Sequence, residues 1–148
     1  MKAPTEKNSQ KLFEVNNLIF DDGIWTANQS NDLSYSDGLD TELELQQILK
    51  NCKDKSWDSP ELALAYDNWA VLYHLSPLRS NILRGLNLKS SGPILEVGCG
   101  CGAITRYLGD KGFDVDAIEG SRKRSRLTAL RCEDLDNVSV ICSDFNTL

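Results

Sequence analysis

The sequence feature that most constrains the fold is the alternating run GCGCG at residues 98–102. A short apolar run at residues 93–97, interrupted by Glu96, precedes the glycines and has the length and composition of a buried strand. Residues 103–108 follow the glycines with a helical pattern that Gly109 and Gly112 are expected to close. Glycine permits positive φ and has no Cβ, so a ligand can approach the backbone of such a turn closely. A strand, a glycine turn and a helix in this order predict one unit of a parallel α/β sheet, with a candidate binding site at the turn.

Two further apolar runs, residues 115–118 and 138–142, predict a second and a third strand. Between them we expect a helix that Ser121 caps, with Leu127 and Leu130 facing inward. Strands that alternate with helices form parallel sheets through right-handed crossovers. The predicted fold class of residues 91–148 is therefore α/β, with a partial parallel sheet of three strands.

The first 90 residues lack this alternation and divide into two regions. Residues 1–40 are polar with short apolar pieces, which predicts an irregular N-terminal arm with turns at Asp22-Gly23 and Asp37-Gly38. Residues 41–90 are predicted to form a helical cap region.

Three helix starts are expected in this cap region. Thr41, with Glu44 three residues later, fits a capping box. Pro60 and Pro77 each follow a serine and fit the first helical position. The first helix has Leu43, Leu45, Ile48 and Leu49 at helix-like spacing, and the third is expected to run through Ile82, Leu83 and Leu86. The second helix is expected to bury Leu62, Leu64, Trp69 and Leu72.

Two acidic residues follow the second and third predicted strands. Glu119 lies 21 residues after Gly98, and a carboxylate there can accept hydrogen bonds from both hydroxyls of a ribose. Asp144 and Phe145 follow the third strand and can offer an adenine an acceptor and an apolar face. The carboxyl ends of parallel strands meet at one edge of a sheet, so these residues and the glycine turn predict a site for an adenosine-containing ligand.

The segment ILEVGCGCGAITRYLGDKGFDVDAIEGS, together with SDF at 143–145, resembles the cofactor-binding motifs of class I S-adenosylmethionine-dependent methyltransferases. The resemblance implies a Rossmann-like fold that binds S-adenosylmethionine. It implies that Gly98, Gly100 and Gly102 shape the turn around the methionine part of the cofactor. It also implies that Glu96 orders the turn, that Glu119 binds the ribose hydroxyls, and that Asp144, with Phe145 beside it, binds the adenine.

A narrower resemblance starts at Tyr73. The stretch YHLSPLRSNILRGL is similar to the lead-in of a bacterial subgroup associated with cell-surface polysaccharide synthesis, which implies a saccharide or another small molecule as methyl acceptor. Class I sheets have seven strands, whereas three are expected here, so we predict that the Rossmann-like part is truncated and that this chain alone is inactive. An unpaired edge of the first strand would favour a homo-oligomer.

Two other functions stay open. Residues 98–103 also fit G-x-G-x-x-A, and Glu119 suits the ribose of NAD, so an NAD(P)-dependent oxidoreductase is the main alternative. The position of Glu96 two residues before the first glycine, and the alternation of the glycines, favour the methyltransferase. The third possibility is a domain that binds the cofactor without catalysis.

No catalytic residue is assigned. His74 is the only histidine and, with Tyr73, is a weak candidate for proton transfer, although a structural role is more common for a lone histidine. Arg79 would suit either the cofactor carboxylate or a surface ion pair. Cys99 and Cys101 are expected to fill tight space in the turn. The five cysteines show no metal-ligand spacing, so no metal is expected.

The net charge of −6 argues against general affinity for nucleic acid, because such affinity requires excess positive charge. The basic run at residues 122–126 is expected to lie on the exposed face of a helix. An odd number of cysteines and the lack of a signal-like apolar start favour a cytoplasmic protein, and no apolar run has the ~20 residues of a membrane span.

Overall fold

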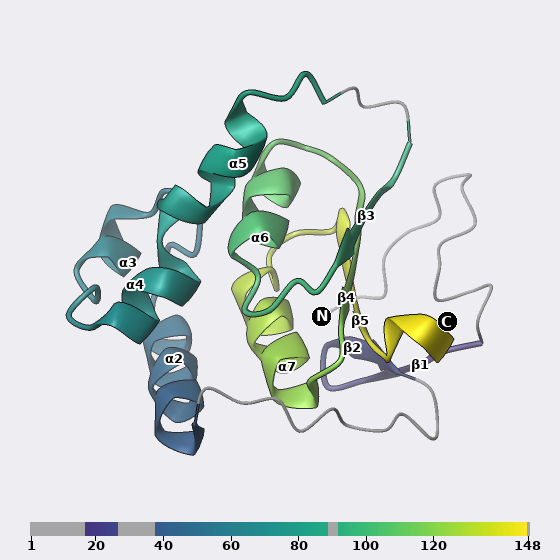
Figure 1. Ribbon diagram of the computed structural model, residues 1–148. Coiled ribbons are helices and arrows are strands. Elements are labelled where there is room, and N and C mark those ends of the chain that lie inside the picture. Colours follow the sequence, from purple (N-terminus) through teal and green to yellow (C-terminus); the bar gives the residue numbers. More distant parts are fainter. Residues whose placement is uncertain (1–16, 27–37, 89–91, 148) are drawn as a thin grey trace.

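The computed structural model describes residues 17–26, 38–88 and 92–147 (Figure 1). Asp37 of the second predicted turn and most of the predicted arm lie outside these residues. The elements in chain order are β1 (Ile19–Asp21), β2 (Ile24–Thr26), α2 (Leu39–Asn51), α3 (Pro60–Ala63), α4 (Trp69–Leu75), η1 (Pro77–Ser80), α5 (Asn81–Arg84), β3 (Ile94–Val97), α6 (Ala103–Asp110), β4 (Val115–Glu119), α7 (Arg122–Arg131), β5 (Val138–Cys142) and η2 (Phe145–Thr147).

The sheet has the strand order β1-β2-β5-β4-β3. Its β5-β4-β3 part is parallel, with Ala117 of β4 opposite both Glu96 and Val140, which confirms the predicted α/β fold with three parallel strands. The sheet is larger than predicted, because β1 and β2 form an antiparallel hairpin and β2 pairs parallel to β5.

The hairpin comes from the segment that we expected to be irregular. Its two-residue turn is Asp22-Gly23, as predicted, and both residues have positive φ, 48° and 82°. Two positive φ values are typical of the tight turns that match the twist of a hairpin. Ile24 is fully buried in the sheet. Strands of three residues are too short to show a period of two, so only the turn was visible in the sequence.

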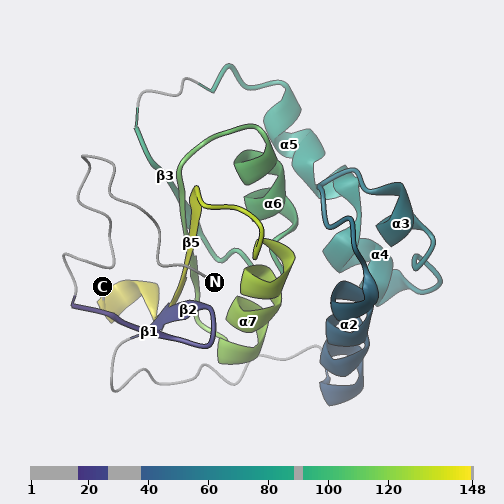
Figure 2. The same ribbon diagram turned by 180° about the vertical axis from the view of Figure 1, so that it is seen from behind.

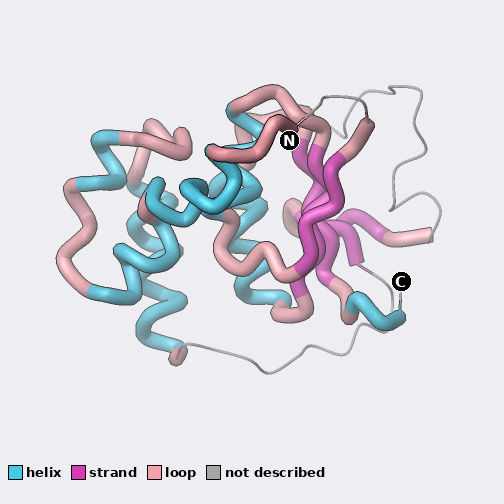
Figure 3. Tube along the Cα trace, turned by 45° about the horizontal axis from the view of Figure 1, so that its top comes forward, coloured by secondary structure: helices cyan, strands magenta, loops and turns pink. Residues whose placement is uncertain are grey.

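The helices form two layers on the same side of the sheet. Helices α6 and α7 lie against the parallel strands, and α2 to α5 lie beyond them (Figures 1 and 2). Figure 3 shows the strands gathered at one side and α2 to α7 at the other, with the short η2 on the side of the strands. We call α2 to α5, with η1, the cap. Among the described residues, no helix is long and apolar enough to cross a membrane.

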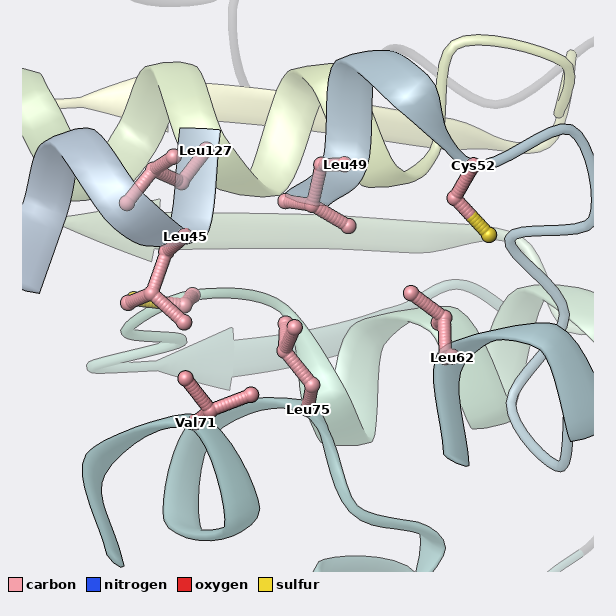
Figure 4. Packing of buried hydrophobic residues seen from close by; sticks show 8 residues of the cluster. Leu45, Leu49, Cys52, Leu62, Val71, Leu75 and Leu127 are labelled. Carbon is pink, nitrogen blue, oxygen red and sulfur yellow. The ribbon is translucent and has the colours of Figure 1, made fainter. Parts of the chain in front are cut away.

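The cap has its own apolar core, which is continuous with the sheet layer (Figure 4). Leu45 and Leu49 of α2 pack against Val71 and Leu75 of α4, and all four are fully buried. Leu127 of α7 belongs to the same cluster, together with Leu62, Cys52 and Cys101. The cap is therefore fixed on α7 and over the glycine turn by burial of apolar surface.

Several predicted cap features are wrong. Helix α2 starts after Gly38 instead of Thr41, and no side chain caps it. The predicted second helix is two helices, because Asn68 accepts a hydrogen bond from Val71 N–H and starts α4 anew. Ser59 and Ser76 do cap the starts of α3 and η1. Of the residues predicted to be buried by the second helix, Leu64 and Trp69 are exposed.

Strand β3 is an edge strand. Among the described residues it pairs only with β4, and Leu95 and Val97 are 50% and 52% exposed. The expectation of a buried strand is therefore wrong for one face of β3. A continuous apolar run predicts burial on both faces only where both faces are covered, and here the described helices cover one.

Candidate functional site

The turn between β3 and α6 is held by backbone hydrogen bonds to the neighbouring strand. The N–H groups of Gly98 and Cys99 both donate to the carbonyl of Ile118 in β4, at 2.8 and 3.0 Å. The N–H of Gly102 donates to the carbonyl of Cys99 at 3.0 Å and closes the turn. The turn therefore lies at the carboxyl ends of β3 and β4, which is the edge where open α/β sheets bind ligands.

The three glycines of the turn have different surroundings. Gly98, Gly100 and Gly102 all have left-handed backbone, with φ of 76°, 59° and 79°. A Cβ on Gly98 or Gly100 would meet nothing within 4 Å, whereas a Cβ on Gly102 would lie 2.9 Å from Cγ2 of Thr128. The first two glycines thus keep space open beside the backbone, and the third lets α6 pack closely on α7.

Glu119 lies at the end of β4 and faces the turn. Its Oε2 accepts a hydrogen bond from Gly100 N–H and its Oε1 accepts one from Ser121 N–H, both at 2.9 Å. Each carboxylate oxygen has two lone pairs, so each can still accept a hydrogen bond from a ligand. Glu119 therefore orders the turn and also presents acceptors at its rim, a double role that spacing alone did not reveal.

Glu96 lies in β3 on the other side of the turn. Its Oε2 accepts a hydrogen bond at 2.7 Å from the hydroxyl of Thr105 in α6. This bond joins the strand before the turn to the helix after it. Burial raises the pKa of Glu96 to about 7, against the smaller opposite effect of the Thr105 bond. The carboxyl is therefore partly protonated near neutral pH.

A cavity of about 360 Å³ opens between the turn and the cap. The cap contributes Tyr73, His74 and Arg79. The guanidinium of Arg79 stacks over the Tyr73 ring, 4.4 Å from its centroid, and forms no ion pair with another described residue. The remaining lining residues are Glu96, Gly98, Cys99, Gly100, Cys101, Ala103, Ile104, Glu119 and Arg124.

Most of the predicted site residues thus surround one cavity, but three do not line it. Gly102 packs on Thr128 instead. Asp144 and Phe145 follow β5, and the N–H of Ser143 donates to the Glu119 carbonyl at 3.1 Å, which places them one strand away from Glu119. Asp144 Oδ1 accepts two hydrogen bonds from Asn146, and Phe145 is 54% exposed.

His74 is buried, and its ring contacts the Tyr73 ring edge-on, with 5.0 Å between centroids. Its backbone carbonyl accepts a hydrogen bond from Arg131 Nη1 at 3.1 Å, and Arg131 Nη2 donates to Leu75 at 2.9 Å. Arg131 is fully buried in α7. It therefore anchors the carboxyl end of α4 over the cavity. This contact was not predicted, because no local pattern marks a buried arginine.

The turn cysteines have a packing role. All five cysteines are free and buried. Burial raises the pKa of the Cys99 thiol well above its ordinary value, so this thiol stays protonated at neutral pH. In the described part of the chain, no group of three or more His, Cys, Asp or Glu side chains is arranged to hold a metal ion.

The basic run at 122–126 forms ion pairs within the chain. Lys123 lies 3.2 Å from Glu42 of α2, and Arg126 lies 3.0 Å from Asp22 of the hairpin turn. Arg124 is buried and lines the cavity, so the expectation of a fully exposed basic face is wrong. The run joins α7 to the cap on one side and to the hairpin on the other.

Comparison with protein-family models gave a match over residues 63–148, to the family described as "Tellurite resistance protein TehB". The matched residues run from the last residue of α3 through η2 and contain every residue that lines the cavity. Comparison with curated proteins gave no match.

Proposed function

The chain belongs to the TehB family of S-adenosylmethionine-dependent methyltransferase-like proteins, and from this premise we propose that it binds S-adenosylmethionine in the cavity between the glycine turn and the cap. The family supports the predicted resemblance to class I methyltransferases and a methyltransferase activity in general. The polysaccharide subgroup and the truncation stay predictions.

The observation that carries this proposal is that the cavity has exposed glycine backbone at the turn and oppositely charged groups on its two sides. Gly98 and Gly100 leave space beside the turn backbone, and Glu119 presents carboxylate oxygens at the end of β4. Arg79 presents guanidinium N–H groups from the cap. We assign Glu119 to the ribose hydroxyls and Arg79 to the cofactor carboxylate, because a guanidinium matches a carboxylate in geometry and charge.

Two other roles follow from the same arrangement. Glu96 ties β3 to α6 across the turn by accepting the Thr105 hydrogen bond. It also lines the part of the cavity that the amino-acid part of the cofactor would fill. Asp144 and Phe145 lie one strand beyond Glu119, on the side where the adenine would follow the ribose. The proposed cofactor thus lies across the ends of β3, β4 and β5, with its methionine part under the cap.

When bound, the cofactor supplies a sulfonium methyl group for transfer to a nucleophile. The chain contributes alignment of the reactants and exclusion of water, which together account for much of the rate in such displacements. We propose a small-molecule acceptor. Tyr73 and His74 stay candidates for taking up the acceptor's proton, because they are the cavity-lining titratable groups of the cap besides Arg79.

Calorimetry with S-adenosylhomocysteine, S-adenosylmethionine and NAD⁺ tests the cofactor. We expect the first two to bind and NAD⁺ to bind at least tenfold more weakly. Tighter binding of NAD⁺ would favour the oxidoreductase instead. Absence of binding by all three would refute the proposed site.

The ribose assignment needs a test that separates it from the role of Glu119 in the turn. We expect Glu119→Ala to weaken S-adenosylhomocysteine at least tenfold, since hydrogen bonds to charged groups contribute about 1.5–3 kcal/mol each. The 2′,3′-dideoxy analogue should lose much less affinity in the same variant. Equal losses for both ligands would assign Glu119 to the turn alone. Glu133→Ala is the control, because Glu133 is an exposed carboxylate in the turn after α7, where it pairs with Lys55 away from the cavity.

Transfer of labelled methyl groups to pools of small molecules, to saccharides and to tellurite tests the catalytic part. Tellurite is included because the family description refers to tellurite resistance. Cofactor binding without transfer to any pool would favour the non-catalytic binding domain.

A further inference from the structure

A second cavity lies on the outer side of the cap, and we call it the cap groove. It has a volume of about 330 Å³ and lies between α4, η1 and α5. Helix α4 has two faces: Val71 and Leu75 point into the cap core (Figure 4), and Trp69 and Tyr73 line the groove. The other lining residues are Leu72, Ser76, Leu78, Arg79 and Ile82.

The cap groove adjoins the proposed cofactor cavity. Tyr73 and Arg79 line both, with their side chains stacked on one another at the boundary. In-line methyl transfer requires the nucleophile to lie about 3–3.5 Å from the methyl carbon. An acceptor must therefore be bound directly beside the cofactor cavity, and the cap groove lies beside it.

The side chains of the groove favour a flat apolar ligand. Trp69, Leu78 and Ile82 are 75%, 63% and 69% exposed, which is unusual for three large apolar residues around one hollow. The Trp69 and Tyr73 rings lie 6.0 Å apart and tilted by 37°, within the range of aromatic contacts. Cavities of this size with apolar walls and few polar groups are typical of small-molecule sites.

One other described cavity adjoins the cofactor cavity, through Glu96, Gly98 and Ile104. It runs along β3, where Leu95 and Val97 are half exposed. Part of its wall is the edge of β3 that pairs with no described strand, and such an edge suits another strand rather than a small molecule. The rest of the wall includes Ile104 and Leu108 of α6, and none of the described aromatic side chains lines this cavity, unlike the cap groove. We therefore place the acceptor in the cap groove.

We propose that the cap groove binds the methyl acceptor, and that this acceptor is a flat, uncharged aromatic molecule of the phenol or indole class. This inference rests on the proposed function, because the groove is an acceptor site only if the adjoining cavity holds the cofactor. The ring would stack on Trp69 and contact Leu78 and Ile82. Its hydroxyl or ring nitrogen would point past Tyr73 toward the cofactor cavity.

The test uses the full chain and the uncharged fluorescent probe N-phenyl-1-naphthylamine, followed by its fluorescence increase on burial. We expect Trp69→Ala and Ile82→Ser each to weaken probe binding about tenfold, through lost stacking and apolar contact. Leu64→Ser is the matched control, because Leu64 is 88% exposed on the cap and does not line the groove. This control should bind the probe like the unmodified chain.

Further measurements relate the groove to the cofactor cavity. 2-Naphthol, a phenol-class compound, should displace the probe, and S-adenosylhomocysteine should not. The affinity for S-adenosylhomocysteine should be the same in Trp69→Ala as in the unmodified chain, which shows that the cavity is intact.

Three results would overturn the inference: equal probe affinity in all variants, displacement of the probe by S-adenosylhomocysteine, or displacement by methyl glucoside at concentrations where 2-naphthol fails. The last result would assign the groove to a saccharide. Failure of the proposed function is a separate outcome, since it would appear as loss of S-adenosylhomocysteine binding in the unmodified chain.

Discussion

Replacement of Gly100 by asparagine tests whether a ligand lies against the glycine turn. Gly100 has a φ of 59°, and asparagine is among the few residues with a side chain that visit this region routinely. A Cβ at this position meets nothing within 4 Å, so the fold has room for the side chain. The backbone bonds of Gly100 to Glu119 and Thr128 do not involve a side chain at position 100 and are kept.

The expected effects on stability and on binding therefore differ in size. An ordinary L-residue costs about 1–2 kcal/mol in left-handed backbone, and asparagine costs less, so we expect the free energy of unfolding to fall by about 1 kcal/mol or less. The new side chain would point into the cavity of about 360 Å³ where the cofactor is proposed to lie. We expect affinity for S-adenosylhomocysteine to fall at least ~100-fold, which corresponds to about 2.8 kcal/mol.

Gly112→Asn is the matched control for this variant. Gly112 also has left-handed backbone, with a φ of 81°, and a Cβ there also meets nothing within 4 Å, but it follows α6 at the opposite end from the turn. Urea unfolding should show similar losses for both variants, and calorimetry should show lost binding only for Gly100→Asn. Near-normal binding by Gly100→Asn, or equal loss in both variants, would refute the reasoning.

Three further predictions follow from the same geometry. Gly102→Ala should lower the free energy of unfolding by about 2–4 kcal/mol, from left-handed strain and from the 2.9 Å approach to Thr128, and adding Thr128→Ser should recover part of the loss in urea unfolding. The raised pKa of Glu96, about 7, means that the folded chain binds this proton more tightly than the unfolded chain, so stability should fall as the pH rises from about 4.5 to about 7. Glu96→Gln should remove about 1–3 kcal/mol of this fall, and an identical pH profile for the variant would contradict the assignment. The half-exposed edge of β3 predicts self-association that Leu95→Lys reduces, and an unchanged concentration dependence in sedimentation velocity would exclude this edge as the contact.

The sequence determined the local units around the turn. The strands at β3, β4 and β5 match the predicted runs within one residue at each end, and the turn and Glu119 lie where their spacing placed them. Such features are readable because apolar runs, glycines and caps act on neighbours in the chain. The starts of α3 and η1 at Ser59 and Ser76 are further examples, since a serine hydroxyl caps the residues directly after it.

Only the tertiary structure decided which residues of these units contact distant segments and which are buried. The three glycines look equivalent in sequence, yet only a Cβ at Gly102 would clash with α7, because that clash depends on where Thr128 lies after the crossover. No sequence pattern marked Arg131 as important. It holds the end of α4 because it donates hydrogen bonds to the carbonyls of His74 and Leu75, more than 50 residues away in the chain. The exposure of Trp69 was likewise missed, since the break at Asn68 turns α4 so that Val71 and Leu75 fill the core instead. Periodicity shows that a helix has an apolar face, but the direction of that face depends on packing between segments far apart in the chain.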